Sequence, residues 1–173
     1  METREIYFAA GCFWGTERLL QSISGVLDTE CGFINGKAGL SSPSYQQVCQ
    51  GDTDCREAVW IRYDPAAVSL PQLLKAFFHV VDPTVFNRQG NDVGTQYQTG
   101  IYFSDAASAQ IVRDYVQKEQ EKYPVFAVEI GEMVQFFPAE EYHQNYLMKN
   151  PGGYCHINPR EFQTIDALIR ESR

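Results

Sequence analysis

Cys12 is the residue of this chain with the clearest potential for chemistry. It stands between an expected strand at residues 5–10 and an expected helix that begins at Phe13. A thiol at that position lies near the unpaired backbone N–H groups and the positive end of the helix dipole, which favour the thiolate. Because the thiolate is the nucleophilic and redox-sensitive form, the position predicts a reactive cysteine, although most isolated cysteines are small, inert core residues.

Cys12 and Arg18 also match the C-x5-R spacing of cysteine-dependent phosphatases. A phosphate-binding loop needs small residues whose backbone N–H groups can close around a dianion. Here Phe13, Trp14 and the anionic Glu17 lie in between. The two rings favour a pocket for an apolar group, and a phosphatase-like enzyme remains an alternative hypothesis for this pair.

Other chemistries of cysteine and histidine lack their usual spacing. The chain has no C-x-x-C pair, which a thioredoxin-like oxidoreductase would need, and Cys49 and Cys55 are not spaced as zinc ligands. We therefore expect neither a metal nor a cofactor. A cysteine–histidine hydrolase would require His143 or His156 beside Cys12, and nothing in the sequence places them there.

Size and charge limit what the protein can bind. With 173 residues, of which 44% are hydrophobic and 21% charged, we expect a monomer with one domain over residues 1–173 that folds without a disulfide or metal. The 14 basic and 22 acidic residues give a net charge of −8, which argues against binding to nucleic acid and anionic membranes. No signal peptide or membrane span is visible, and five scattered cysteines, an odd number, fit a reducing cytoplasm.

Hydrophobic periodicity predicts the elements that must position Cys12. The first six are a strand at 5–10, a helix at 13–23, strands at 26–33 and 57–63, a helix at 70–81 and a strand at 99–103. This β-α-β-β-α-β order is that of the ferredoxin-like split sandwich, in which two helices cover one face of a sheet. We therefore predict an α+β fold of this type with additional helices and long loops.

The remaining segments are expected as additions to that sandwich. Two long loops, at 35–44 and from about 82 up to Thr99, separate the elements, with a short turn-like stretch at 45–50. Beyond them we predict a helix at 105–123 capped by Ser104 or Asp105, a strand region at 125–137, a helix at 138–147 opened by its proline, and a terminal helix at about 159–173.

Five segments, in order along the chain, resemble the signature of the A-type peptide methionine sulfoxide reductases. They are G-C-F-W-G-T-E at 11–17, P-S-Y-Q-Q-V-C-Q-G-D-T at 43–53 followed by E-A-V at 57–59, Q-G-N-D-V-G-T-Q-Y at 89–97, Y-H-Q-N-Y at 142–146, and G-Y-C at 153–155. The resemblance covers roughly residues 5–158, and so many blocks in the same order make coincidence remote.

The resemblance implies that the chain reduces methionine S-sulfoxide, free or in peptides, as a protein-repair enzyme of oxidative stress. Cys12 would attack the sulfur and end as a sulfenic acid, while Glu57 would be the neutral acid that protonates the leaving oxygen. A carboxyl group that stays protonated near neutral pH needs an apolar site. Strand alternation supports this role, because it directs Glu57 and the cationic Arg56 to opposite faces of the sheet.

Five further residues take roles in substrate binding from the same resemblance. Phe13 and Trp14 would form the pocket for the methyl group. Tyr45 and Tyr97 would hydrogen-bond the sulfoxide oxygen, and Asp92 would orient the substrate through water. From the residues alone, the two tyrosines are equally well explained as packing residues, and Asp92 as a turn residue.

Cys155 matches the family's resolving cysteine, which would clear the sulfenic acid by forming a Cys12–Cys155 disulfide that thioredoxin reduces. It follows a Pro-Gly-Gly segment at 151–153 that could move, and no cysteine comes after it. Cys55 remains an alternative resolving thiol, and Cys31 is expected to be a buried small residue. A catalytically silent domain that binds methionine-like side chains is the alternative from another functional class.

Overall fold

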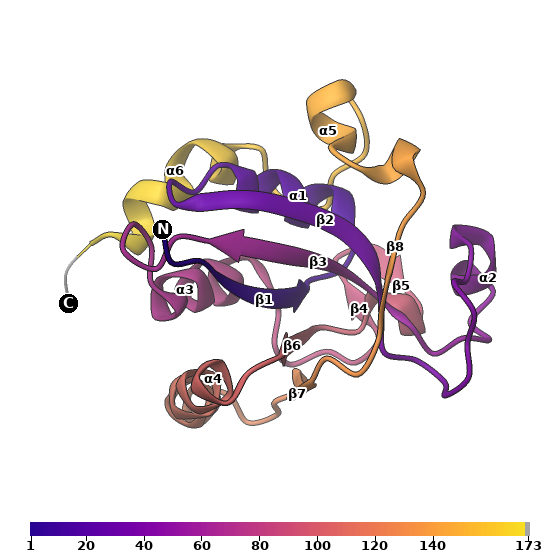
Figure 1. The fold of residues 1–173 in the computed structure, drawn as a ribbon, viewed down its shortest axis with the longest axis horizontal. Helices are drawn as coiled ribbons and strands as arrows, with labels where there is room; N and C mark the ends of the chain where they lie inside the picture. Colours follow the sequence, from indigo (N-terminus) through magenta and orange to yellow (C-terminus); the bar gives the residue numbers. More distant parts are fainter. Residues whose placement is uncertain (172–173) are drawn as a thin grey trace.

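Residues 1–171, the part of the chain that the computed structural model describes, contain a sheet of six strands in the order β7-β6-β1-β3-β2-β8 (Figure 1). The strands are β1 (Arg4–Ala9), β2 (Val26–Ile34), β3 (Arg56–Tyr63), β6 (Gly100–Phe103), β7 (Glu129–Glu132) and β8 (Phe136–Pro138). The four inner strands are antiparallel to one another, while β7 is parallel to β6 at one edge and β8 is antiparallel to β2 at the other. The strand β3 therefore lies inside the sheet.

Two helices connect the inner strands. The helix α1 (Phe13–Gln21) joins β1 to β2, α3 (Leu70–Val80) joins β3 to β6, and both pack into the same core on one face of the sheet. The inner order β6-β1-β3-β2 with these two connections is the ferredoxin-like arrangement, so the predicted β-α-β-β-α-β sandwich is confirmed. Its six elements begin and end within two residues of the predicted bounds.

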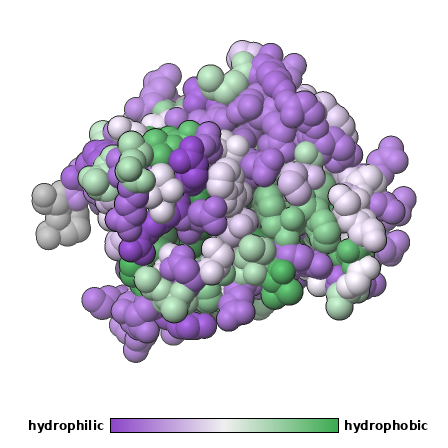
Figure 2. Space-filling model, viewed as in Figure 1, coloured by the Kyte–Doolittle hydropathy of each residue, from purple (hydrophilic) through white to green (hydrophobic). Residues whose placement is uncertain are grey.

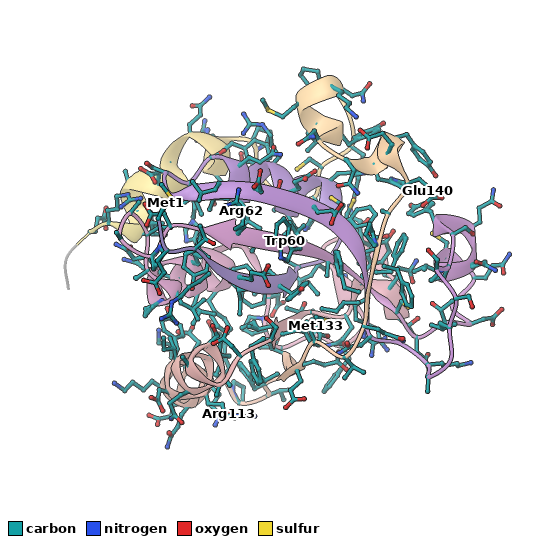
Figure 3. The ribbon with its side chains drawn as sticks, in the orientation of Figure 1. Met1, Trp60, Arg62, Arg113, Met133 and Glu140 are labelled. Carbon is teal, nitrogen blue, oxygen red and sulfur yellow. The ribbon has the colours of Figure 1, made fainter. Side chains whose placement is uncertain are left out.

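The two faces of the sheet have different neighbours. In β1, Ile6 and Phe8 are buried in the main core with the helices, while Tyr7 and Ala9 belong to a smaller cluster on the opposite face. Side chains alternate between the two faces along a strand, so β1 contributes residues to both clusters. The second face is turned to the viewer in Figure 1, and partly buried Trp60 is labelled on it in Figure 3. Figure 2 shows apolar and polar residues mixed there.

Side-chain caps explain where two of the helices begin. The helix α3 starts after Ser69, whose hydroxyl accepts the Gln72 backbone N–H while the Gln72 side chain accepts the N–H of Ser69, which is a capping box. The helix α4 (Ala106–Glu119) starts after Asp105, whose carboxylate accepts the N–H of Ser108 at 2.7 Å. Of the two predicted caps, Asp105 is the one that the helix uses.

The expected turn-like stretch and the second expected loop contain short ordered elements. The helix α2 (Tyr45–Cys49) forms where the sequence predicts only a turn, because Ser44 makes a second capping box. The loop before β6 contains a hairpin of β4 (Arg88–Gln89) and β5 (Asp92–Val93), followed by a 3-10 turn (Thr95–Tyr97). Asp92 and Tyr97 are therefore held in regular structure.

The segment from 125 to 147 is where the sequence prediction is wrong. The expected strand region is two short strands, β7 and β8, at opposite edges of the sheet. The expected helix at 138–147 is not formed: the segment holds a 3-10 turn (Glu141–His143), then Asn145 at φ 55°, then the start of α5 (Tyr146–Lys149). The proline at 138 ends β8 instead of opening a helix.

Gln144 explains this course of the chain. Its side-chain oxygen accepts the N–H of Cys31 at 2.7 Å, and its amide nitrogen donates to the carbonyls of Cys31 and Ala139 at 2.8 and 3.1 Å. The side chain thus continues the hydrogen bonding of β2 beyond the end of β8. Gln144 and Cys31 lie 113 residues apart, so no local pattern reveals the pair.

The last helix, α6 (Arg160–Ile169), is shorter than the predicted terminal helix, and residues 172 and 173 of that prediction lie outside the described residues. It packs beside α1, where Arg18 lies over the ring of Phe162 at 5.1 Å. Within residues 1–171 no helix combines the length and the apolar character needed to cross a membrane.

Replacing Gln144 with Met should lower the free energy of unfolding by about 1–3 kcal/mol, because the buried N–H of Cys31 loses its partner. The carbonyl of Cys31 keeps the Ala139 N–H at 2.9 Å and contributes little to this loss. Urea unfolding measures the change. The matched control is Gln110→Met on the exposed side of α4, which should stay within about 0.5 kcal/mol of the wild type. A Gln144→Met protein as stable as that control would contradict the assigned role.

Candidate active site

Cys12 and Glu57 meet at the start of α1. Cys12 is the N-cap residue of the helix, and only 7% of its surface is exposed. The next residue, Phe13, donates its backbone N–H to Oε1 of Glu57 at 3.1 Å. Glu57 comes from β3 and is 1% exposed. The fold therefore fixes a buried carboxyl group beside a buried thiol.

Burial decides the protonation state of Glu57. Loss of solvent raises its pKa to about 8, against the opposing effect of the Phe13 N–H. The second carboxyl oxygen, Oε2, is buried and has no hydrogen-bond partner within residues 1–171. At pH 7 the group is thus mainly a neutral acid, and Oε2 can donate its proton to a bound molecule.

Arg56, the neighbour of Glu57 in sequence, is directed away from it. Its guanidinium group donates twice to the Glu129 carboxylate, both times at 3.1 Å, and Glu129 also accepts the hydroxyl of Tyr102 at 2.6 Å. Tyr102 belongs to the cluster on the second face of the sheet. The predicted alternation is confirmed, and it keeps this cation from stabilising an ionised Glu57.

The helix start favours the thiolate of Cys12, as expected from the sequence, but burial of the sulfur has the larger effect on its pKa. Burial raises the pKa of the Cys12 thiol well above its usual range, and an ionised Glu57 raises it further. The backbone N–H groups of Trp14 and Gly15 lower this pKa but do not outweigh burial. The predicted position at the helix start is confirmed, and the group rests as a thiol because it is almost completely buried.

Aromatic side chains line the start of α1. The Trp14 ring stacks on Tyr146 with centroids 3.8 Å apart, and its indole N–H donates to Nδ1 of His143 at 3.0 Å. The His143 ring also lies 5.2 Å from Phe13 and 4.5 Å from Tyr45. Phe13 itself is buried, whereas Trp14 is half-buried and accessible. The predicted apolar pocket residues are therefore together, with His143 and Tyr146 added to them.

Tyr45 and Tyr97, the two tyrosines that match the family, lie close enough to Glu57 for its charge to affect their pKa values. Tyr45 begins α2 and Tyr97 ends the 3-10 turn before β6. Burial first, and then the charge of an ionised Glu57, raise the pKa of both phenols, so both keep their protons and can donate hydrogen bonds. Segments distant in sequence thus converge on one carboxyl group.

Asp92 and Cys155 also lie near Cys12. Asp92 accepts the hydroxyl of Tyr154 through Oδ1 at 2.8 Å. The Cys155 sulfur lies against α1 at Gly15, where a Cβ would stand only 2.8 Å from it. Gly15 is three residues beyond Cys12 in the same helix, so Cys155 already lies near Cys12 while both sulfurs are free.

The remaining cysteines have other surroundings. Cys31 is fully buried and donates to Oε1 of Glu17 at 3.3 Å, in line with the expected core residue. Cys55 is also buried, and its thiol donates to the carbonyl of Asn35 at 3.4 Å. Cys49 is exposed at the end of α2.

Over residues 1–171 the structure does not provide the side-chain arrangement that the phosphatase or the cysteine–histidine hydrolase would need. Arg18, the arginine of the phosphatase pattern, donates to Ser22 at 2.8 Å and covers Phe162, so it faces α6 and not Cys12. His156 does come close to the start of α1, but its Nε2 is bound to the carbonyl oxygen of Ala10 at 2.8 Å and not to the thiol. His156 and Tyr154 were missed as site residues, although they flank Cys155 in sequence.

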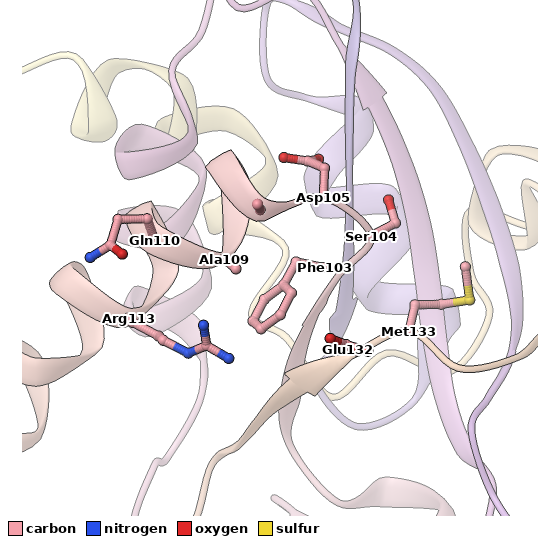
Figure 4. Close-up of a pocket in the computed structure, with 9 residues that line it drawn as sticks. Phe103, Ser104, Asp105, Ala109, Gln110, Arg113, Glu132 and Met133 are labelled. Carbon is pink, nitrogen blue, oxygen red and sulfur yellow. The ribbon is translucent and has the colours of Figure 1, made fainter.

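A hollow elsewhere on the surface does not compete with this site. It has a volume of about 570 Å³ and lies between the start of α4 and the strands β6 and β7 (Figure 4). Arg113 covers the ring of Phe103 in it, at 5.0 Å. It contains none of the predicted site residues and no cysteine.

Known proteins resemble this chain over nearly its whole length. A family model described as peptide methionine sulfoxide reductase matches residues 4–171. The peptide methionine sulfoxide reductase MsrA of Mycoplasma genitalium is 49% identical over 155 residues, which are 89% of this chain and 98% of that protein. The comparison thus extends well beyond the residues of the site.

Solved structures agree. Mxr1 of Saccharomyces cerevisiae in reduced form has a TM-score of 0.84 and 37% identity, covering 91% of this chain and 92% of its own. Methionine sulfoxide reductase A of Corynebacterium diphtheriae has a TM-score of 0.83 and 36% identity, covering 88% and 77%. Mxr1 has also been solved in complex with Trx2.

Replacing Glu57 with Gln should stabilise the fold near neutral pH. In the wild type Glu57 is protonated in the folded protein at pH 7 but ionised in the unfolded chain, because folding raises its pKa. This difference lowers the free energy of unfolding by about 3 kcal/mol at pH 7. The difference between Glu57→Gln and the wild type should therefore be near zero below the unfolded pKa, about pH 4, and grow until about pH 8. Urea unfolding across this range measures it.

Glu17→Gln is the matched control, because Glu17 is equally buried, at 1% exposed. Its carboxylate accepts hydrogen bonds from the Asn145 N–H, the Thr29 hydroxyl and the Cys31 thiol. A glutamine amide has a single acceptor oxygen and cannot replace both carboxylate oxygens, so Glu17→Gln should lower the free energy of unfolding. If both substitutions shift stability in the same direction at pH 7, the assigned protonation state of Glu57 is wrong.

Proposed function

Because the chain belongs to the peptide methionine sulfoxide reductase family, we propose that Cys12, Glu57 and Cys155 carry out its reaction. The protein is a peptide-methionine (S)-S-oxide reductase, which reduces methionine sulfoxide with thiols. The observation that supports the residue assignment most strongly is the neutral Glu57 carboxyl group beside Cys12 at the start of α1.

In the first step Glu57 donates the proton on Oε2 to the oxygen of the bound sulfoxide, which is a poor leaving group until it is protonated. The Cys12 sulfur attacks the sulfoxide sulfur as its own proton leaves to replace the one that Glu57 gave. The S–O bond of the substrate and the transient bond between the two sulfurs then break as the oxygen bonds to Cys12, which is left as a sulfenic acid, and methionine departs with its thioether restored. Because burial keeps Cys12 as a thiol at rest, its proton is available to restore the protonated form of Glu57.

The substrate enters with its methyl group against Phe13 and Trp14, where sulfur–aromatic contacts contribute about 0.3–1.5 kcal/mol. The protonated hydroxyls of Tyr45 and Tyr97 hydrogen-bond the sulfoxide oxygen, and the half-buried positions of both residues support this. Asp92 orients the substrate through water from the β5 side. A pocket with a ring on one side and donors on the other accepts one epimer, and membership of the MsrA family indicates that this is the S form.

Cys155 resolves the sulfenic acid, and a Cys12–Cys155 disulfide results. Its position against Gly15 supports this assignment over Cys55, whose sulfur is buried against the carbonyl of Asn35. Thioredoxin then reduces the disulfide, a proposal supported by the complex of the yeast relative Mxr1 with Trx2. Catalysis uses no metal or bound cofactor.

In the cell, the reaction repairs proteins damaged by oxidative stress. We place the enzyme in the cytoplasm as a monomer whose residues 1–173 form a single domain. A reducing compartment suits a chain with five free cysteines that needs Cys12 and Cys155 as thiols between turnovers.

The rate of methionine formation in a single turnover should fall as the pH rises through about 8, because the active, protonated form of Glu57 is lost there. Glu57→Gln should lower the rate by about 10²–10⁴-fold and abolish this decline. Cys12→Ser should form no methionine. Rapid quenching followed by chromatography measures the product, and a rate that stays constant from about pH 7 to 9 in the wild type would contradict the role of Glu57 as the acid.

Cys155→Ser should still release one methionine per enzyme in a single turnover, but turnover driven by thioredoxin should stop, because no disulfide can form. Cys55→Ala is the matched control and should recycle like the wild type. Mass spectrometry after one turnover identifies the bridged sulfurs. Recycling that persists in Cys155→Ser and fails in Cys55→Ala would make Cys55 the resolving residue.

A further inference from the structure

His156, the residue after Cys155, is buried over the turn that carries Cys12. Its side chain is 5% exposed. Nε2 lies 2.8 Å from the carbonyl oxygen of Ala10, and a carbonyl can only accept, so Nε2 carries a proton and donates it. The contact ties the segment of Cys155 to the residues just before Cys12.

The other ring nitrogen, Nδ1, is left without a partner. It is buried and makes no hydrogen bond within residues 1–171. Burial lowers the pKa of His156 from its ordinary value, so the ring is neutral at pH 7 and Nδ1 presents a lone pair. An unpaired acceptor in the interior is costly, and the proposed reaction so far does not use it.

A carboxylate stands ready to stabilise a proton on that nitrogen. Oδ2 of Asp92 lies 3.9 Å from Nδ1 and is itself buried and unpartnered among the described residues. Oδ1 of the same group is held by the Tyr154 hydroxyl at 2.8 Å. A protonated Nδ1 would therefore gain an ion pair with Asp92, whereas the neutral ring leaves both groups unsatisfied.

The Cys155 sulfur and Nδ1 of His156 both lie against Gly15 of α1. A Cβ on Gly15 would stand 2.8 Å from the Cys155 sulfur and 3.3 Å from Nδ1, so both atoms flank one point on α1. Of the titratable groups near the ring, Asp92 from β5 acts on it directly. Cys12 comes two residues after Ala10, the partner of Nε2, and Tyr154 and Cys155 precede the ring in its own segment. Of these, only Asp92 is a carboxylic acid.

Cys155 needs a group to take its proton. Burial raises the pKa of its thiol, and the charge of Asp92 raises it further. In the reduced protein the thiol donates to the carbonyl of Ile157 at 3.2 Å, which cannot remove the proton. A neutral thiol is a poor nucleophile, so attack on the sulfenic acid requires a base.

We propose that Nδ1 of His156 accepts the proton of Cys155 as that sulfur attacks the sulfenic acid on Cys12, and that Asp92 stabilises the resulting imidazolium. The S–H bond of Cys155 and the S–O bond of Cys12 break, and the S–S bond forms. The oxygen leaves as water once it has taken up the proton. The sulfenic acid is the oxidant, so no further reagent is needed. The assignment rests on the proposed function, in which Cys155 is the resolving thiol.

His156→Gln separates the base from the anchor, because the glutamine amide can still donate to Ala10 while Nδ1 is lost. After one equivalent of methionine sulfoxide without reductant, this variant should form methionine at the wild-type rate but form the disulfide about 100-fold more slowly at pH 7. Methionine is measured by chromatography, and the loss of free thiols is measured in acid-quenched samples. His156→Ala, which lacks both functions, is the comparison.

The wild type provides a second readout. Its rate of disulfide formation should decrease as the pH is lowered through the depressed pKa of His156, below 6.5, and be level above it. In His156→Gln the rate should instead rise with pH up to the high pKa of Cys155 itself.

Two results would overturn the proposal: a His156→Gln variant that forms the disulfide at the wild-type rate while His156→Ala is slow, or a wild-type profile that already rises continuously with pH. In the first case the ring only anchors the segment. If instead the wild type releases methionine without any Cys12–Cys155 bridge, the proposed resolving role fails, and mass spectrometry distinguishes this from a failure of His156.

Discussion

A carboxyl group kept un-ionised in the interior is the constraint on which the rest of this structure depends. Glu57 can hold its proton near neutral pH only where water is excluded, and its place on β3, between β1 and β2 and under the start of α1, provides this. On an edge strand the same residue would be solvated and ionised. One oxygen is satisfied by the Phe13 N–H, which leaves the other free for chemistry.

The same burial sets the state of the thiol and the kind of molecule that fits. Cys12 and Glu57 both rest neutral, so neither of the two groups presents a charge to a bound molecule. A sulfoxide is also uncharged, and it can enter without the desolvation cost that a phosphate dianion would meet. The separation of Arg56 to the other face, where it pairs with Glu129, preserves this neutrality.

The helix α1 connects these groups to segments from the far end of the chain. Cys12 begins the helix, Gly15 leaves room for Cys155, and Glu17 accepts the backbone N–H of Asn145 at 2.7 Å. Gln144 fixes the same crossing segment to β2, and His156 fixes the next one to Ala10. Cys12 and the segment of Cys155 are thus both held by contacts to α1 and to the residues just before it.

The sequence by itself determined the ferredoxin-like core, the start of α1 at Cys12 and the opposite directions of Arg56 and Glu57, because strand alternation, helix periodicity and caps are local properties of the chain. It also identified the candidate residues through the resemblance of short blocks. Tertiary structure alone decided the path of residues 125–147, since Gln144 has its partner at Cys31, 113 residues away. It likewise decided that Cys12 rests as a thiol and that the segment of Cys155 and His156 lies against the start of α1. Burial and contacts between distant segments set both, and neither is encoded in local spacing.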